Sequence, residues 1–150
     1  MMKLIYSLAL VVFIVQLSYA CRCMPPTQQT AYCRSQWISH ARIVSKQTVG
    51  GSVEYTVNHV EVFKNHTSPL PNKIFTPNSS AACGVTELAI STDYLLAGTT
   101  NSGTNALQLS SCLYMPGNDF QPSGFPTWNQ VPSDLLLKLR QKQFKPCPIA

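Results

Sequence analysis

The chain has 150 residues, the size of one ordinary domain, and 45% of them are hydrophobic, which excludes a disordered chain. Charged residues make up only 11%, and eleven prolines and seven glycines interrupt any long helical pattern. This composition favours extracellular β-structure and argues against a helical cytosolic protein.

The first twenty residues have the pattern of a secretory signal peptide. Lys3 supplies a positive charge, residues 4–15 form an apolar run, and Ser18 and Ala20 are small residues at the positions that a signal peptidase reads. We therefore expect cleavage before Cys21 and a mature domain of residues 21–150. The apolar run is too short for a membrane anchor. The sequence thus predicts a protein secreted into the extracellular space or matrix.

Five segments have the pattern of β-strands: residues 38–46, 53–63, 73–76, 94–99 and 106–112. In the second segment the apolar side chains fall at odd positions up to Val57 and at even positions from Val60. This shift predicts a β-bulge near Asn58 and His59, and the resulting bend helps to close a small barrel. In the last segment, Leu107 and Leu109 are expected to face inward.

The chain changes character after Cys112. Residues 115–132 form a loop rich in Pro, Gly and Asn. Three aromatic residues of this loop are expected to pack against the core: Phe120, Phe125 and Trp128. Ser133 is placed to cap a helix that runs to about Gln143. One face of that helix is apolar and carries Leu135, Leu136 and Leu139. The elements together predict an all-β fold with a terminal helix, a five-stranded OB-type Greek-key barrel.

All six cysteines lie in the expected mature domain, at positions 21, 23, 33, 83, 112 and 147. An even number in a secreted chain indicates three disulfides, although the residues alone leave their connectivity open. In an extended segment, Cys21 and Cys23 point to one side and Arg22 to the other.

The residues around the cysteines form motifs that are typical of one protein family. The mature chain would begin Cys21-Arg22-Cys23-Met24-Pro25-Pro26, and residues 79–84 read Ser-Ser-Ala-Ala-Cys-Gly. Together with residues 93–98 and 107–112, these motifs resemble the inhibitory domain of the tissue inhibitors of metalloproteinases, a netrin-like OB barrel. The resemblance covers essentially all of the mature chain. The family's second subdomain has no counterpart in it, so the chain resembles a single-domain member. It implies the pairs Cys21–Cys83, Cys23–Cys112 and Cys33–Cys147.

The resemblance implies a secreted inhibitor that forms one-to-one complexes with matrix-type zinc metalloproteinases. The backbone amine and carbonyl of Cys21 would chelate the catalytic zinc of the protease, and Arg22 would enter the adjoining specificity pocket. The chain would need no cofactor of its own and would share the zinc of its target. The residues expected to contact the protease are Cys21, Arg22, Cys23, Met24, Pro25, Ser80, Ala81, Ala82 and Cys83.

Arg22 also motivates an alternative function. Most members of the family carry Thr or Ser at this position, and burying an unpaired guanidinium in an apolar pocket is costly. The alternative is a non-inhibitory netrin-like module that binds extracellular matrix or a receptor. The basic residues near the end of the chain are expected to form a solvated helix face, with heparan sulfate or another matrix component as the alternative ligand: Lys138, Arg140, Lys142 and Lys145.

Other classes of function lack support in the sequence. The chain has no paired acids, no Ser/His/Asp set and no phosphate-binding glycine loop, so we do not expect an enzyme. Without Lys3 it carries ten basic and six acidic residues, a net charge of +4, which is too weak and dispersed to indicate nucleic acid. We do not expect the protein to bind a membrane. The spacing of His40, His59 and His66 is not that of metal ligands. Asn65 and Asn78 begin tripeptides that accept N-linked glycans.

Overall fold

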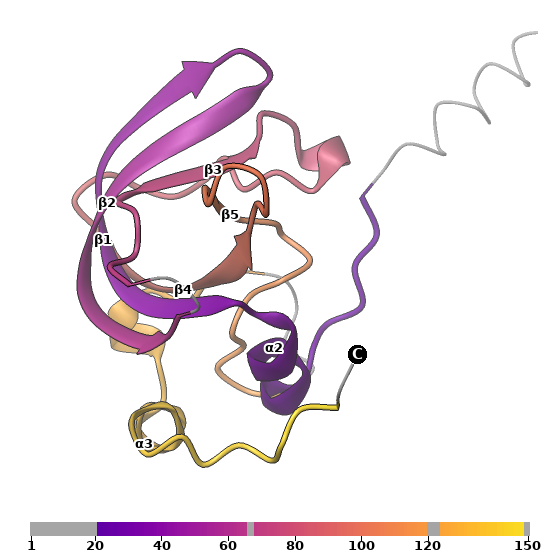
Figure 1. The fold of residues 1–150 in the computed structure, drawn as a ribbon, viewed down its shortest axis with the longest axis vertical. Coiled ribbons are helices and arrows are strands. Elements are labelled where there is room, and N and C mark those ends of the chain that lie inside the picture. The colour runs from indigo at the N-terminus through magenta and orange to yellow at the C-terminus, as the bar shows by residue number, and fades with distance from the viewer. Residues whose placement is uncertain (1–20, 66–67, 120–123, 149–150) are drawn as a thin grey trace, which may run out of the picture.

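The computed structural model describes residues 21–65, 68–119 and 124–148, so the expected signal peptide, His66 and Phe120 lie outside the described residues. Within these residues, five strands form a closed barrel in the order β1-β2-β3-β5-β4 (Figure 1). The strands are β1 (Trp37–Val49), β2 (Ser52–Lys64), β3 (Lys73–Pro77), β4 (Asp93–Thr100) and β5 (Leu107–Gln108). The helical elements are α2 (Gln28–Arg34), η2 (Ser80–Ala82), η3 (Trp128–Gln130) and α3 (Ser133–Arg140). The predicted fold class is confirmed.

Pairing around the barrel is antiparallel except at one place. β1 pairs with both β2 and β4, and β3 pairs with β5 in parallel at Ile74↔Leu107. β5 is shorter than the strand predicted over residues 106–112. The Leu109 amide still donates to the Phe75 carbonyl of β3 at 2.8 Å. After Leu109 the chain turns away, since the Ser111 amide donates to the Cys83 carbonyl at 2.9 Å and a tight turn closes between Ser110 and Leu113. Leu107 and Leu109 are buried as expected.

The strand β2 contains the predicted bulge, but its consequence differs from the expectation. The register against β1 shifts between the pairs His40↔Glu61 and Ala41↔His59, which leaves Val60 as the extra residue. Val60 is 56% and Val62 42% exposed, whereas Phe63 is 7% exposed. The side chains of Val60 and Val62 therefore face solvent. Phe63 is the extra residue of a second register shift, between the pairs Ile38↔Lys64 and Ser39↔Val62, and its side chain is buried.

Two buried clusters lie on opposite sides of the barrel wall. The first fills the barrel and includes Trp37, Tyr55 and Leu96, with Phe125 packed against it. The second includes Leu95 and lies against α2 and α3, with Trp128 packed at its edge. Leu95 and Leu96 face opposite sides because successive side chains alternate along a strand. Residues 95 and 96 of β4 thus join the barrel interior to the helical layer.

The helices differ from the sequence-based expectations in their ends. The helix α2 was not predicted. It begins after Thr27, and the Thr27 side chain caps it by accepting a hydrogen bond from the Thr30 amide at 3.1 Å. Pro132 rather than Ser133 is the N-cap of α3, and the helix ends at Arg140 instead of Gln143. Lys142 adopts a left-handed conformation, which ends the helical path. The apolar face is as predicted, because Leu135 and Leu139 are buried and Leu136 is partly buried beside them.

The segment after α3 is fastened to α2. Cys147 forms a disulfide with Cys33, with a Cα–Cα distance of 5.3 Å. The Gln29 side chain donates to the Lys145 carbonyl and accepts from the Lys145 amide, both at 3.0 Å. The Tyr32 and Phe144 rings stack at 4.0 Å. In the described part of the chain, no helix has the length and apolar character needed to cross a bilayer.

We expect the protein to lose stability between pH 7 and pH 5 because of its buried histidines. His59 bonds to Ser39 at 2.9 Å and to the Pro71 carbonyl at 3.0 Å, and burial lowers its pKa, as it does for His40. The unfolded chain therefore binds protons first as the pH falls through the ordinary histidine range, which favours unfolding until the lower folded pKa is reached. Asp93 and Glu61 stay ionised in this window because their carboxyl pKa values are lowered.

The measurement is urea unfolding at pH 7.5 and pH 5.0, for the native chain and for His59→Gln. Glutamine keeps a donor and an acceptor but does not titrate. The variant should lose less stability on acidification than the native chain. An equal loss in both proteins would contradict the assignment to His59.

Candidate functional site

Two exposed segments, residues 21–25 and 80–83, lie side by side at one edge of the barrel, and we call them the ridge. Cys21 is bonded to Cys83 across the two segments, with a Cα–Cα distance of 5.2 Å. Met24 is 89% exposed, and the side chains of Arg22 and Pro25 also face solvent. In the second segment the exposed residues are Ser80, Ala81 and Ala82. Residues far apart in sequence therefore form one continuous projection.

Two disulfides hold the first segment of the ridge. Besides Cys21–Cys83, the pair Cys23–Cys112 joins it to the segment after β5, with a Cα–Cα distance of 5.0 Å. These bonds, together with Cys33–Cys147, are the same three pairs that the family resemblance implies. The sulfurs of the two ridge disulfides pack together, with Cys21 Sγ 3.6 Å from Cys112 Sγ. The alternation of an extended chain leaves Arg22 pointing outward between them.

The second segment of the ridge is a single turn of 3₁₀ helix, η2, with a defined local cause. The Ser79 side chain accepts a hydrogen bond from the Ala81 amide at 3.2 Å, which caps the turn. Cys83 ends the turn in a left-handed conformation, with φ at 59°. Gly84 follows so close to strand β3 that a Cβ atom there would collide with the Pro77 carbonyl. Glycine at this position lets the ridge lie directly against the barrel.

The ridge borders a depression of about 700 Å³ that both segments line together with Ser111 and Tyr114. Among the described residues, Arg22 makes no hydrogen bond and no ion pair, and it is the only charged side chain of the ridge. Neither Ser111 nor Tyr114 was predicted as a site residue, because residues 106–112 were expected to form a regular strand and Tyr114 lies just after it. Ser111 lies in the motif of residues 107–112 and no local motif marks Tyr114, but both residues reach the depression only through the fold.

The sulfurs of the three ridge cysteines, Cys21, Cys23 and Cys83, and of Cys112 lie within 4.8 Å of one another, an arrangement that in reduced proteins can hold a metal ion. All four are bonded in disulfides here. A metal-binding cysteine ligates as a thiolate, so these oxidised sulfurs serve as covalent clamps and not as ligands.

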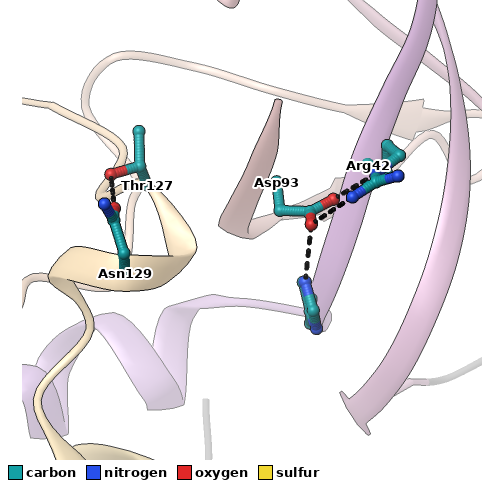
Figure 2. A network of polar contacts seen from close by, with 5 residues as sticks. Arg42, Asp93, Thr127 and Asn129 are labelled. Carbon is teal, nitrogen blue, oxygen red and sulfur yellow. Dashed lines mark hydrogen bonds and ion pairs between the residues drawn. The ribbon is translucent and has the colours of Figure 1, made fainter. Parts of the chain in front are cut away.

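Two further groups of polar contacts lie away from the ridge, one around Asp93 and one between Thr127 and Asn129. Arg42 of β1 donates two hydrogen bonds to Asp93 of β4, at 2.8 and 2.9 Å, and lowers the pKa of that carboxyl (Figure 2). His40 lies 3.8 Å from Asp93 and stacks on Trp128 with ring centroids 3.7 Å apart. In Figure 2, Thr127 and Asn129 form a separate contact near this pair, at 2.5 Å. The contacts of Asp93 with Arg42 and of His40 with Trp128 join β1, β4 and η3.

The two candidate glycosylation residues are at the surface. Asn78 is exposed and lies two residues before Ser80, beside the ridge. Asn65 is exposed as well, and its tripeptide continues into residues outside the described part of the chain. Glycan attachment at either residue stays a prediction.

Comparison with known proteins identifies the family. The model of the family "Tissue inhibitor of metalloproteinase" matches residues 19–119. One relative is the Caenorhabditis elegans protein tag-225, which is named as a candidate metalloproteinase inhibitor. It is 32% identical over 93% of this chain and 98% of its own length. Human metalloproteinase inhibitor 2 is 25% identical over 74% of this chain and 54% of its own length. The corresponding values for chicken metalloproteinase inhibitor 3 are 29%, 56% and 42%.

These vertebrate relatives are thus about twice as long as the part of them that matches this chain. The nematode relative matches over nearly its whole length. The matched residues 19–119 include the ridge and all five strands of the barrel. The chain belongs to the tissue inhibitor of metalloproteinase family.

Proposed function

We propose that this chain is a secreted inhibitor of zinc metalloproteinases, and that the ridge enters the active-site cleft of the protease. Membership of the family supports the inhibitory class. The observation that carries the mechanism is the position of Cys21, which begins an exposed projection and is fixed there by its disulfide to Cys83. Once the expected signal peptide is removed, the free α-amine of Cys21 would stand at the start of the ridge.

The chemistry of Cys21 suits a zinc ion with one open position. The α-amine nitrogen and the carbonyl oxygen belong to the same residue, so both can bind one metal ion in a five-membered chelate ring. A catalytic zinc in a protease holds a water molecule in its fourth position, and this chelate would take the place of that water. The amine has an ordinary pKa of about 7.7–8.0 and must be neutral to bind metal, so inhibition should weaken as the pH falls.

The two ridge disulfides favour binding through preorganisation. Cys21–Cys83 and Cys23–Cys112 attach the first segment to two separate parts of the barrel. A ridge that is already ordered loses little conformational entropy in a complex, so more of the contact energy appears as affinity. In this proposal Met24, Pro25, Ser80, Ala81 and Ala82 extend along the cleft on either side of Cys21.

Arg22 is the residue that sets the range of targets. Its guanidinium forms no hydrogen bond or ion pair with the described residues of its own chain and would be the side chain nearest to the zinc. Arg22→Thr should strengthen inhibition of a metalloproteinase with an apolar specificity pocket by about tenfold, because it removes the cost of burying an unpaired guanidinium. The inhibition constants of both proteins measure this effect.

Arg34→Thr is the matched control, since Arg34 is an exposed arginine of α2 outside the ridge. It removes the same charge and should leave inhibition unchanged. Inhibition that stays equal or weakens in Arg22→Thr would contradict a pocket role for Arg22.

Arg22 is also the observation that favours a second candidate function, a netrin-like module that binds matrix or a receptor and does not inhibit proteases. Lys138 and Arg140 already pair with Asp134 and Glu61, at 3.9 and 2.9 Å, which leaves Lys142 and Lys145 for an anionic matrix ligand such as heparan sulfate. Titration of protein that begins at Cys21 against a panel of matrix metalloproteinases separates the functions. Inhibition supports the first, and its absence in a correctly folded protein supports the second.

A further inference from the structure

A second depression lies beside the ridge. It has a volume of about 410 Å³, and its apolar lining consists of Val85, Leu88, Tyr94 and Phe125. It shares Ser80, Gly84 and Ser111 with the depression that the ridge borders, so the two hollows form one continuous surface. A surface formed by the ridge alone would leave this apolar hollow uncovered in a complex.

The walls of the second depression are held by hydrogen bonds to the barrel. The Tyr55 hydroxyl donates to the Val85 carbonyl at 2.9 Å, and the Val85 amide donates to the Thr76 hydroxyl at 2.8 Å. The Lys46 ammonium donates to the Thr86 carbonyl at 2.6 Å. These anchors hold residues 85 and 86 from three different strands. The hollow is therefore preformed, and a partner would not have to open it.

The rim of this hollow carries an acidic side chain without a basic partner. Glu87 is exposed, and its carboxylate accepts a hydrogen bond from the Thr86 hydroxyl at 3.0 Å. The acidic residues that pair with Lys or Arg in the described part of the chain are Glu54, Glu61, Asp93 and Asp134. Glu87 stands outside these pairs, next to an apolar cavity, in a chain with an excess of positive charge.

We propose that this hollow is a second contact for the same protease, which receives an apolar side chain of a protease surface loop that also carries a lysine or arginine opposite Glu87. The proposal rests on the proposed inhibitory function and extends it to a part of the partner away from the zinc. Continuity with the ridge places the hollow within the reach of a bound protease. The apolar lining and the carboxylate at its rim together define the chemistry of that loop.

Filling the hollow tests its occupancy. Thr86→Trp places a large ring at the rim and keeps the backbone carbonyl that Lys46 contacts, so inhibition of the most strongly inhibited metalloproteinase should weaken about tenfold or more. Leu137→Trp is the control, because Leu137 is 52% exposed on α3, which packs on the helical side of the barrel (Figure 1). The control should leave inhibition unchanged. Melting temperatures show that both variants fold.

Charge reversal tests the chemistry of the partner loop. Glu87→Lys should slow association about fivefold at low ionic strength, and the difference should shrink at high salt because exposed charges are screened. Asp134→Lys makes the same change of net charge on α3 and should have a much smaller effect. If both Thr86→Trp and Glu87→Lys inhibit like the native protein, the second contact is wrong while the inhibitory function stands. If the native protein inhibits no protease, both proposals fail.

Discussion

A chain with one extra alanine before Cys21 should inhibit metalloproteinases at least about a thousandfold less than a chain that begins at Cys21. The added residue converts the α-amine into an amide, whose nitrogen has no free electron pair for a metal. It also places additional atoms where the zinc would lie. The measurement is a titration of a matrix metalloproteinase catalytic domain with each protein. Both proteins should show the same three disulfides and the same unfolding midpoint.

Acetylation of the Cys21 amine provides the control for steric bulk. The acetyl group is smaller than an alanine residue but removes the basic nitrogen equally, so the acetylated protein should also lose its inhibition. If the extended or the acetylated protein inhibits as well as the protein with a free amine, zinc chelation by Cys21 is wrong. A contact elsewhere on the surface would then have to account for the inhibition.

The barrel was predictable because its signals are local. Alternation at Ala41 and Ile43, and again at Val53, Tyr55 and Val57, marks the strands that fill the interior, and all five side chains are at most 3% exposed. The helix α2 has no such signal, since its sequence is short and mostly polar. Gln28 of α2 is held by long-range contacts, with its amide donating to Asp119 at 2.6 Å and its side chain to the Gly117 carbonyl at 2.8 Å. Tertiary contacts of this kind leave no periodic pattern.

The ridge was predictable for a different reason. The resemblance to the inhibitor family, carried by the motifs around Cys21 and Cys83, implied which residues would share a surface, and the structure brings residues 21–25 and 80–83 together through Cys21–Cys83. The hollow beside the ridge could not be inferred in this way. Its lining comes from separate segments around residues 85, 94, 111 and 125, and it exists only because the barrel brings these segments together.

Loss of Cys23–Cys112 and loss of Cys33–Cys147 should have similar effects on stability and different effects on inhibition. The two bonds span sequence separations of 89 and 114 residues. In the chain-entropy model each contributes about 3–5 kcal/mol to the free energy of unfolding. Replacing both cysteines of a pair with alanine should therefore lower stability to a similar extent in the two variants, as measured by urea unfolding. Alanine pairs avoid free thiols that could exchange with the remaining disulfides.

The difference in inhibition follows from what each bond holds. Without Cys23–Cys112, the first ridge segment keeps a single covalent attachment, so it gains freedom that binding must remove, and inhibition should weaken about tenfold or more. Without Cys33–Cys147, both ridge disulfides remain, and the Gln29–Lys145 and Tyr32–Phe144 contacts still hold the last segment to α2. That variant should inhibit like the native protein at a temperature where it is folded. An equal loss of inhibition in both variants would mean that overall stability, and not the order of the ridge, limits binding.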